Sequence, residues 1–201
     1  MRGTFSEIDA ATKETMRGIS MPDGAKIGYE DLQLLTVPHR NFCGGVSMGR
    51  IIVARELTDE VLDIFAELHA MGYPIEKMEL IDRYAGLITE ELNSLDNASM
   101  GHNNSSAFCY RVVDGTDRLS MHALGRAIDL NPKINPWIRG ELIEPHNAAK
   151  YADRSGEGLS DVERRAMIHS GDAVCSVFER YGWTWGGDWV DSKDYQHFEK
   201  N

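Results

Sequence analysis

The chain has 201 residues, enough for one domain that would remove roughly 70% of its unfolded surface from water. Apolar residues make up 42% and charged residues 26%, which is ordinary for a soluble globular protein. No apolar run approaches the roughly 20 residues that cross a bilayer. The formal net charge of -11 argues against a nucleic-acid partner, because binding phosphates needs clustered cations. We therefore expect a soluble protein with one core and no transmembrane segment.

Cysteine usage and the N-terminus bear on the cellular compartment. Cys43, Cys109 and Cys175 are odd in number and far apart, and no Cys-x-x-Cys pair occurs. This pattern predicts neither a disulfide framework nor a thiolate zinc site, and we expect the cysteines to be buried. The chain opens on a polar stretch without the apolar segment of a signal peptide.

Residues 1–50 are predicted to be an N-terminal extension that belongs to the same unit as the rest of the chain. Apolar side chains recur at loose helical spacing within residues 6–17. A hairpin begins towards the end of the extension, punctuated by Gly44, Gly45 and Gly49, and residues 50–54 are predicted to be its second strand.

The next elements are predicted to be scaffold. Thr58 can cap a helix over residues 58–68, which has acidic residues in its first turn and an apolar face. A strand is predicted over residues 77–82, followed by an irregular polar stretch over residues 93–106. Residues 107–113 alternate in character, so a strand there would direct Arg111 to the face opposite the aromatic residues.

The C-terminal half mixes strands and helices. Residues 127–130 are predicted to form a strand. Ser160 opens a capping-box pattern, and the helical region that follows is predicted to break near Gly171 and end at Gly182. Elements in this mixed order indicate an α+β domain.

Two motifs carry the chemistry. Residues 120–129 read Ser-x-His-x-x-Gly-x-Ala-x-Asp, and residues 194–199 read Asp-x-x-His-Phe-Glu. A turn through Gly125 followed by a strand could bring His122 and Asp129 together, with His197 arriving from the distant segment. Two imidazoles and one carboxylate suit one zinc ion with an open fourth position.

These motifs resemble those of the zinc D-alanyl-D-alanine carboxypeptidases of the VanY type, whose relatives include phage L-alanyl-D-glutamate endopeptidases and the hedgehog signalling domain. The resemblance covers residues 51–201, which we take as a zinc peptidase domain. It implies a hedgehog/DD-peptidase-like fold, in which a small, mainly antiparallel sheet carries the zinc site and helices pack behind it.

The resemblance also implies roles for individual residues. Asp194 stands where the family has its catalytic carboxylate, which takes a proton from zinc-bound water. Arg111 matches an arginine that binds the substrate carbonyl oxygen or the oxyanion formed from it. Ser120 could bind substrate or a ligand side chain. Trp185 and Trp189 could wall a peptide groove, with core packing as the alternative, and Ser106 belongs to a segment that could line the same groove.

The function implied is zinc-dependent hydrolysis of an amide in peptidoglycan stem peptides, with the terminal D-alanyl-D-alanine bond as the expected target. Two alternatives stay open: an L-alanyl-D-glutamate endopeptidase, and a zinc-containing binding module without catalysis. The resemblance places the protein in the cell envelope or outside the cell. The sequence leaves the oligomeric state open.

Overall fold

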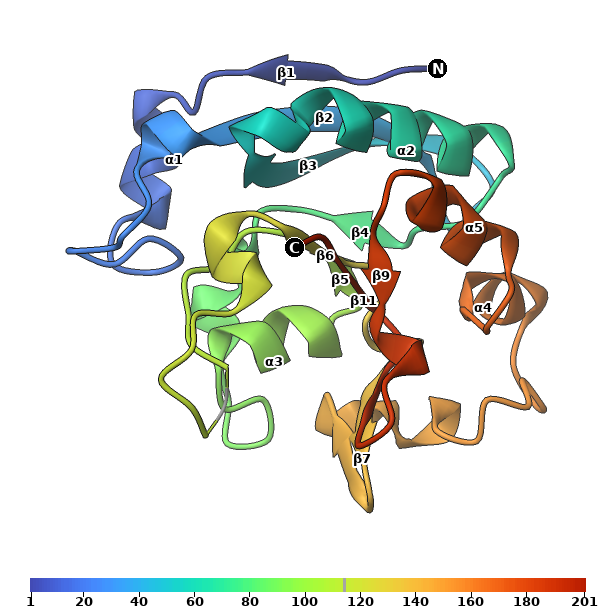
Figure 1. The fold of residues 1–201 in the computed structure, drawn as a ribbon. Coiled ribbons are helices and arrows are strands. Elements are labelled where there is room, and N and C mark those ends of the chain that lie inside the picture. The colour runs from blue at the N-terminus through green and yellow to red at the C-terminus, as the bar shows by residue number, and fades with distance from the viewer. Residues whose placement is uncertain (114) are drawn as a thin grey trace.

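The computed structural model describes residues 1–113 and 115–201 (Figure 1). The helices are α1 (Ala10–Met16), α2 (Thr58–Ala70), α3 (Leu95–Gly101), α4 (Asp161–Ala166) and α5 (Ala173–Arg180). The strands are β1 (Thr4–Ser6), β2 (Leu32–Arg40), β3 (Val46–Ala54), β4 (Lys77–Met78), β5 (Asn104–Ser105), β6 (Ala127–Asp129), β7 (Trp137–Arg139), β8 (Leu142–Glu144), β9 (Thr184–Trp185), β10 (Lys193–Asp194) and β11 (His197–Glu199).

The N-terminal part is a sheet in the order β1-β2-β3, with α2 packed along it (Figure 1). The predicted hairpin is present, but its second strand begins at Val46 rather than at residue 50. Gly49 is therefore not a turn residue. It lies inside β3, where a Cβ would come within 2.6 Å of the side chain of Met78, so the glycine permits a close approach of β4.

The predicted helix over residues 58–68 is confirmed as α2, but Thr58 does not cap it: Thr58 is the first helical residue, and Leu57 stands at the N-cap position without a side-chain cap. The apolar stripe of α2, which includes Val61, Phe65 and Leu68, is buried in the main core together with Leu35 and Val37 of β2. The N-terminal hairpin thus shares the main hydrophobic core with α2, α5 and the strands β6, β9 and β11.

A second sheet, in the order β6-β11-β9, is the platform for the site. Its rear face packs on α5, where the ring of Phe198 stacks on that of Phe178 with centroids 3.9 Å apart. Because side chains alternate along a strand, His197 and Glu199 point away from this core on the opposite face of β11. The predicted α+β class, with small antiparallel sheets backed by helices, is confirmed.

Two segments have a different secondary structure from the one predicted. The strand predicted over residues 77–82 is only the short β4, and a 3₁₀ helix begins at Ile81. The stretch over residues 93–106 contains helix α3 and strand β5 instead of being irregular. The side chain of Ser94 caps α3 by accepting a hydrogen bond from the backbone N–H of Asn97 (3.1 Å). This cap was not recognised in the sequence because the surrounding residues are also polar.

The strand predicted over residues 107–113 is instead an extended segment outside the sheets. It makes isolated backbone hydrogen bonds to its surroundings, and Val112 bridges to Leu119. The alternation of its side chains still holds in part, since Phe108 and Tyr110 pack on the same apolar cluster while Cys109 is buried outside it.

The capping box at Ser160 and the break near Gly171 are both confirmed. Glu163 and Ser160 satisfy each other's backbone N–H groups, α4 ends at Ala166, and Gly171 has a φ of 81° between α4 and α5. Of the predicted buried cysteines, Cys109 and Cys175 are buried but Cys43 is exposed in the β2–β3 turn. No helix among the described residues has the length and apolar character needed to cross a membrane.

Candidate metal centre

His122 is carried by a 3₁₀ helix, Met121–Leu124, whose two ends are fixed by the motif residues around it. At the start, the hydroxyl of Ser120 accepts a hydrogen bond from the backbone N–H of His122 (3.2 Å). At the end, Gly125 adopts a φ of 66°, and a Cβ there would lie 2.5 Å from the backbone nitrogen of Ala54. The predicted bend at Gly125 is confirmed, and only glycine fits it.

Asp129 and His197 come together through strand pairing. They are direct partners in the antiparallel register of β6 and β11, and directly opposite residues place their side chains on the same face. Ser106 pairs with Asp129 from the other side through two backbone hydrogen bonds of 2.8 and 3.1 Å. Asp129 is therefore held between two neighbouring segments.

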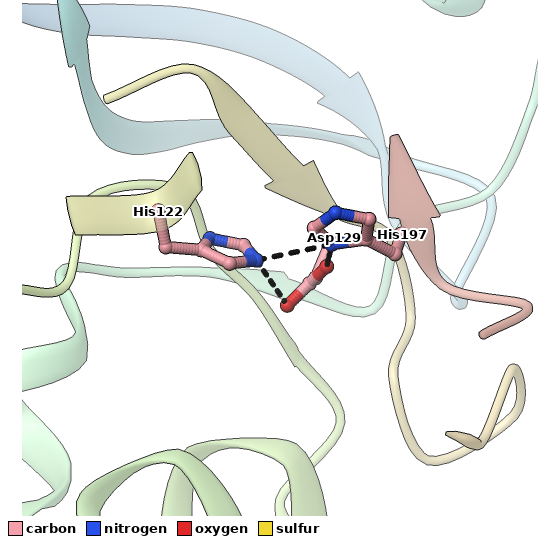
Figure 2. Close-up of side chains that lie close together, drawn as sticks. All are labelled: His122, Asp129 and His197. Atoms are coloured by element: carbon pink, nitrogen blue, oxygen red, sulfur yellow. Dashed lines mark hydrogen bonds and ion pairs between the residues drawn. The ribbon is translucent and has the colours of Figure 1, made fainter. Parts of the chain in front are cut away.

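The three side chains converge on one another from separate elements (Figure 2). Nε2 of His122 lies 3.2 Å from Nδ1 of His197 and 3.2 Å from Oδ2 of Asp129, and Nδ1 of His197 lies 3.0 Å from Oδ1 of Asp129. All three residues are buried. In a tetrahedral zinc site, ligand atoms about 2.0–2.1 Å from the ion stand about 3.3 Å from one another. The observed separations match that spacing.

Hydrogen bonds on the outer side of each ring fix which nitrogen faces inward. Nδ1 of His122 lies 2.5 Å from the carbonyl oxygen of Ala107, and Nε2 of His197 lies 3.1 Å from Oε2 of Glu199. Carbonyl and carboxylate oxygens only accept, so these nitrogens carry the protons. Nε2 of His122 and Nδ1 of His197 are then the nitrogens that can bind a metal, and the donor set fits a zinc ion.

The charges around the cluster are those of a cation site. Burial alone would lower the pKa of His197, but hydrogen bonds to Asp129 and Glu199 raise that pKa to about 10. Burial would raise the pKa of Asp129, but the neighbouring His122 and His197 lower it well below its usual range. A bound metal ion would take the place of the extra proton that these carboxylates attract.

Asp194, at the end of β10, lies beside this cluster. Its Oδ1 is buried and has no hydrogen-bond partner among residues 1–113 and 115–201. Burial raises the pKa of Asp194 to about 6, against the opposing charge of His197. Gly186 allows the close packing here, since a Cβ on it would lie 2.9 Å from Cβ of Asp194 and 3.3 Å from Cβ of His197.

Arg111 lies on the extended segment that borders the cluster. Its side chain is 36% exposed and forms an ion pair with Asp96 of α3. Burial would lower the pKa of Arg111, but the charges of Asp96, Asp129 and Asp194 raise it. The guanidinium therefore lies within the electrostatic field of the cluster's carboxylates.

Three of the residues expected to bind substrate have other contacts in the structure. Ser120 caps the turn of His122 by accepting from its backbone N–H, a contact with the backbone of that residue rather than with its side chain. Ser106 is buried as the backbone partner of Asp129. Trp185 is 5% exposed, stacks near Phe198 in the core and donates from Nε1 to the carbonyl of Tyr195 (3.0 Å). This packing leaves Trp185 little surface to offer a substrate.

Trp189 is instead the tryptophan beside the cluster. Its ring centroid lies 5.4 Å from that of His197, and 36% of the residue is exposed. Trp189 therefore offers an exposed aromatic surface next to His197.

Sequence reasoning missed the partners that orient the two imidazoles. Glu199 belongs to the quoted motif but received no role, although residues two apart on a strand share a face and its spacing from His197 was the available signal. The contact of His122 with the carbonyl of Ala107 had no signal, because any residue type supplies a backbone carbonyl.

The comparisons with known proteins point to the same region. Residues 114–200, less than half of the chain, match the family model described as D-alanyl-D-alanine carboxypeptidase, of the M15 peptidases. No curated protein and no solved structure matches the chain. The matched span contains His122, Asp129, Asp194 and His197, whereas Arg111 lies just before it, so the segment that resembles a peptidase is the one that builds the buried cluster.

Proposed function

We propose that the protein is a zinc-dependent peptidase that removes the terminal D-alanine from peptidoglycan stem peptides. The observation that carries the proposal is the buried convergence of His122, Asp129 and His197 inside the span that matches the carboxypeptidase family model. The proposed site of action is the cell envelope or the space outside the cell, where such stem peptides occur. A hedgehog/DD-peptidase-like arrangement of the domain over residues 51–201 is part of the same proposal.

His122, Asp129 and His197 would hold the ion. A zinc ion in this position supplies Lewis acidity, which polarises a carbonyl and lowers the pKa of a bound water towards about 7. Oxygen and nitrogen donors in a buried, rigid setting are consistent with this chemistry.

Asp194 is the proposed general base. Its buried Oδ1 has no described partner, and its pKa of about 6 lets it accept a proton near neutral pH and release it again. It would take a proton from the attacking water and deliver it to the amine that leaves when the C–N bond breaks.

Arg111 is the proposed electrostatic partner of the substrate carbonyl. A fixed guanidinium stabilises the negative charge that grows on this oxygen in the transition state more than it stabilises the neutral ground state. Trp189, exposed beside His197, is the proposed wall of the substrate groove.

A product assay tests the proposal. The purified protein, its metal content measured, is incubated with a defined pentapeptide stem and the products are weighed by mass spectrometry. Asp194→Ala should retain zinc and lose hydrolysis, and His122→Ala should lose both. Asp191→Ala, which removes an exposed carboxylate from the loop before β10, should behave as the parent.

The products distinguish the alternatives. Free D-alanine without internal cleavage supports the carboxypeptidase. Cleavage between L-alanine and D-glutamate would replace it by an endopeptidase. Zinc binding without any cleavage would leave a binding module, and a protein without zinc would mean that the cluster is only a hydrogen-bonded triad.

A further inference from the structure

The segment that bears Arg111 is fastened to the turn that bears His122. The carbonyl of Ala107 accepts from Nδ1 of His122, the backbone N–H of Cys109 donates to the carbonyl of His122 (3.3 Å), and the carbonyl of Arg111 accepts from the backbone N–H of Ser120 (3.0 Å). These contacts fix the backbone of Arg111 relative to the cluster. They do not fix its long side chain.

One contact does act on the side chain. Nε of Arg111 lies against Oδ2 of Asp96, whose side chain is only 24% exposed. The closest approach is through Nε, which donates no hydrogen bond to the carboxylate, and neither Nη group donates one among residues 1–113 and 115–201. That side chain is 36% exposed and can be reached by a ligand from solution.

Asp96 is itself held by a rigid element. It lies in the first turn of α3, which Ser94 caps, and α3 packs against the 3₁₀ helix Ile81–Leu87 and against β5. A carboxylate in the first turn also interacts favourably with the helix dipole. The position of Asp96 is thus set by contacts that do not involve the metal cluster.

We propose that Asp96 is a positioning residue for Arg111, holding its guanidinium so that the Nη edge meets the carbonyl oxygen of the substrate. The inference rests on the proposed function, because it assigns the target of Arg111. An unrestrained arginine gives up rotamer entropy when it is fixed, and a misplacement of about 1 Å can cost about 100-fold in rate. Asp96 supplies the restraint before substrate binds.

The first test separates positioning from binding. Asp96→Ala should lower kcat by about 10- to 100-fold with KM changed less than about 2-fold, since the interaction is made in the transition state. Nε of Arg111 finds no hydrogen-bond partner among residues 1–113 and 115–201, so the contact with Asp96 acts through charge. Asp96→Asn removes that charge at nearly constant size and should therefore lose about as much as Asp96→Ala. Ser94→Ala is the matched control: it weakens α3 but leaves the ion pair, and it should keep kcat close to that of the parent. An equal loss in Ser94→Ala and Asp96→Ala would reduce the role of Asp96 to helix stability.

A double-mutant cycle tests whether Asp96 acts through Arg111. In an Arg111→Ala background, Asp96→Ala should cause no further fall in kcat. An additional fall as large as in the parent background would overturn the inference.

A spectroscopic readout keeps the inference independent of activity. In the arginine Nε–Hε region of a ¹⁵N NMR spectrum, the signal that disappears in Arg111→Lys should move in Asp96→Ala and stay in place in Ser94→Ala. An unmoved signal in Asp96→Ala would overturn the pairing. If the signal moves but the parent cleaves no stem peptide, the proposed function fails while the Asp96–Arg111 coupling stands.

Discussion

Asp129 and His197 are direct cross-strand partners in the β6–β11 pairing, and their side chains meet at 3.0 Å although 68 residues separate them in the sequence. The same imidazole contacts Glu199 through its other nitrogen. His197 thus lies between two carboxylates, that of Asp129 inside the cluster and that of Glu199 outside it.

This arrangement predicts that Glu199 controls zinc affinity. Glu199→Ala removes the acceptor that keeps the proton on Nε2 of His197, and it should weaken zinc binding by about 10- to 100-fold. Glu199→Gln keeps an acceptor oxygen and should lose less. Competition with a chromophoric chelator measures the affinity, and Glu141→Gln, at an exposed position, is the control. Unchanged affinity in Glu199→Ala would mean that another nitrogen or another residue binds the ion.

The sequence predicted the cluster because His122, Asp129 and His197 lie in two motifs that together resemble those of a zinc peptidase family. The glycine at 125 marks a left-handed turn, and the alternation after it places Asp129 on a strand. The sequence could not show that β6 pairs with β11, nor that the register of this pairing places Asp129 opposite His197, because register depends on the whole sheet.

Two wrong predictions of secondary structure have a common cause. Two of the mispredicted segments, helix α3 and residues 107–113, are short. Tertiary contacts stabilise them, and a local sequence pattern does not report such contacts. The sequence left Trp185 open between a groove wall and core packing, because a tryptophan in a motif gives no sign of which side of the sheet it packs on; the structure buries it.

The raised pKa of Asp194 predicts how stability depends on pH in the metal-free protein. Its folded pKa of about 6 lies above the usual value of 3.8, so the favourable contribution of the protonated form is fully present below about pH 4 and is lost as the pH rises through about 6. Asp194→Asn mimics the protonated form. It should therefore raise the urea midpoint of the metal-free protein at pH 7.5, by an energy on the order of 2–3 kcal/mol, and change it little at pH 4.

Urea unfolding in the presence of a chelator, at both pH values, checks this prediction. Asp191→Asn, at an exposed carboxylate in the loop before β10, should leave the urea midpoint unchanged at both pH values. A midpoint that falls in Asp194→Asn at pH 7.5 would show that the ionised carboxylate is stabilised by its surroundings.

Glu163 is predicted to stabilise the α4 region at neutral pH. Its carboxylate accepts from Lys150 Nζ (2.9 Å), Ser160 Oγ (2.7 Å) and Tyr151 OH (2.7 Å), and these bonds lower its pKa to about 2. Glu163→Ala should cost about 1–2 kcal/mol at pH 7 through the lost cap. Because the folded pKa is depressed, the stabilisation is present above about pH 4.5 and is lost as the pH falls towards 2.

Thermal unfolding of Glu163→Ala and the parent between pH 7 and pH 2.5 tests this dependence. The difference between the two proteins should narrow as the pH falls. Glu157→Ala, at an exposed position in the preceding loop, should match the parent throughout. A difference that stays constant with pH would assign the effect to packing rather than to the carboxylate charge.

Gly125 is predicted to be the least replaceable glycine near the cluster. Gly125→Ala puts a methyl group in a backbone with a φ of 66° and within 2.5 Å of the nitrogen of Ala54, which donates to the carbonyl of Gly125 (2.8 Å). Gly140→Ala is the matched control, because Gly140 has a φ of 60° but open space around it. The control should lose about 1–2 kcal/mol from the left-handed backbone alone.

Gly125→Ala should lose clearly more than the control, because β3 or the turn of His122 must move to relieve the contact. It should also weaken zinc binding, since the backbone N–H of Gly125 donates to the carbonyl of His122 (3.1 Å) and any shift of the turn displaces that ligand. Urea unfolding and chelator competition on both variants measure the two effects. Equal destabilisation of the two variants, with zinc affinity unchanged in both, would show that the turn relaxes without moving His122.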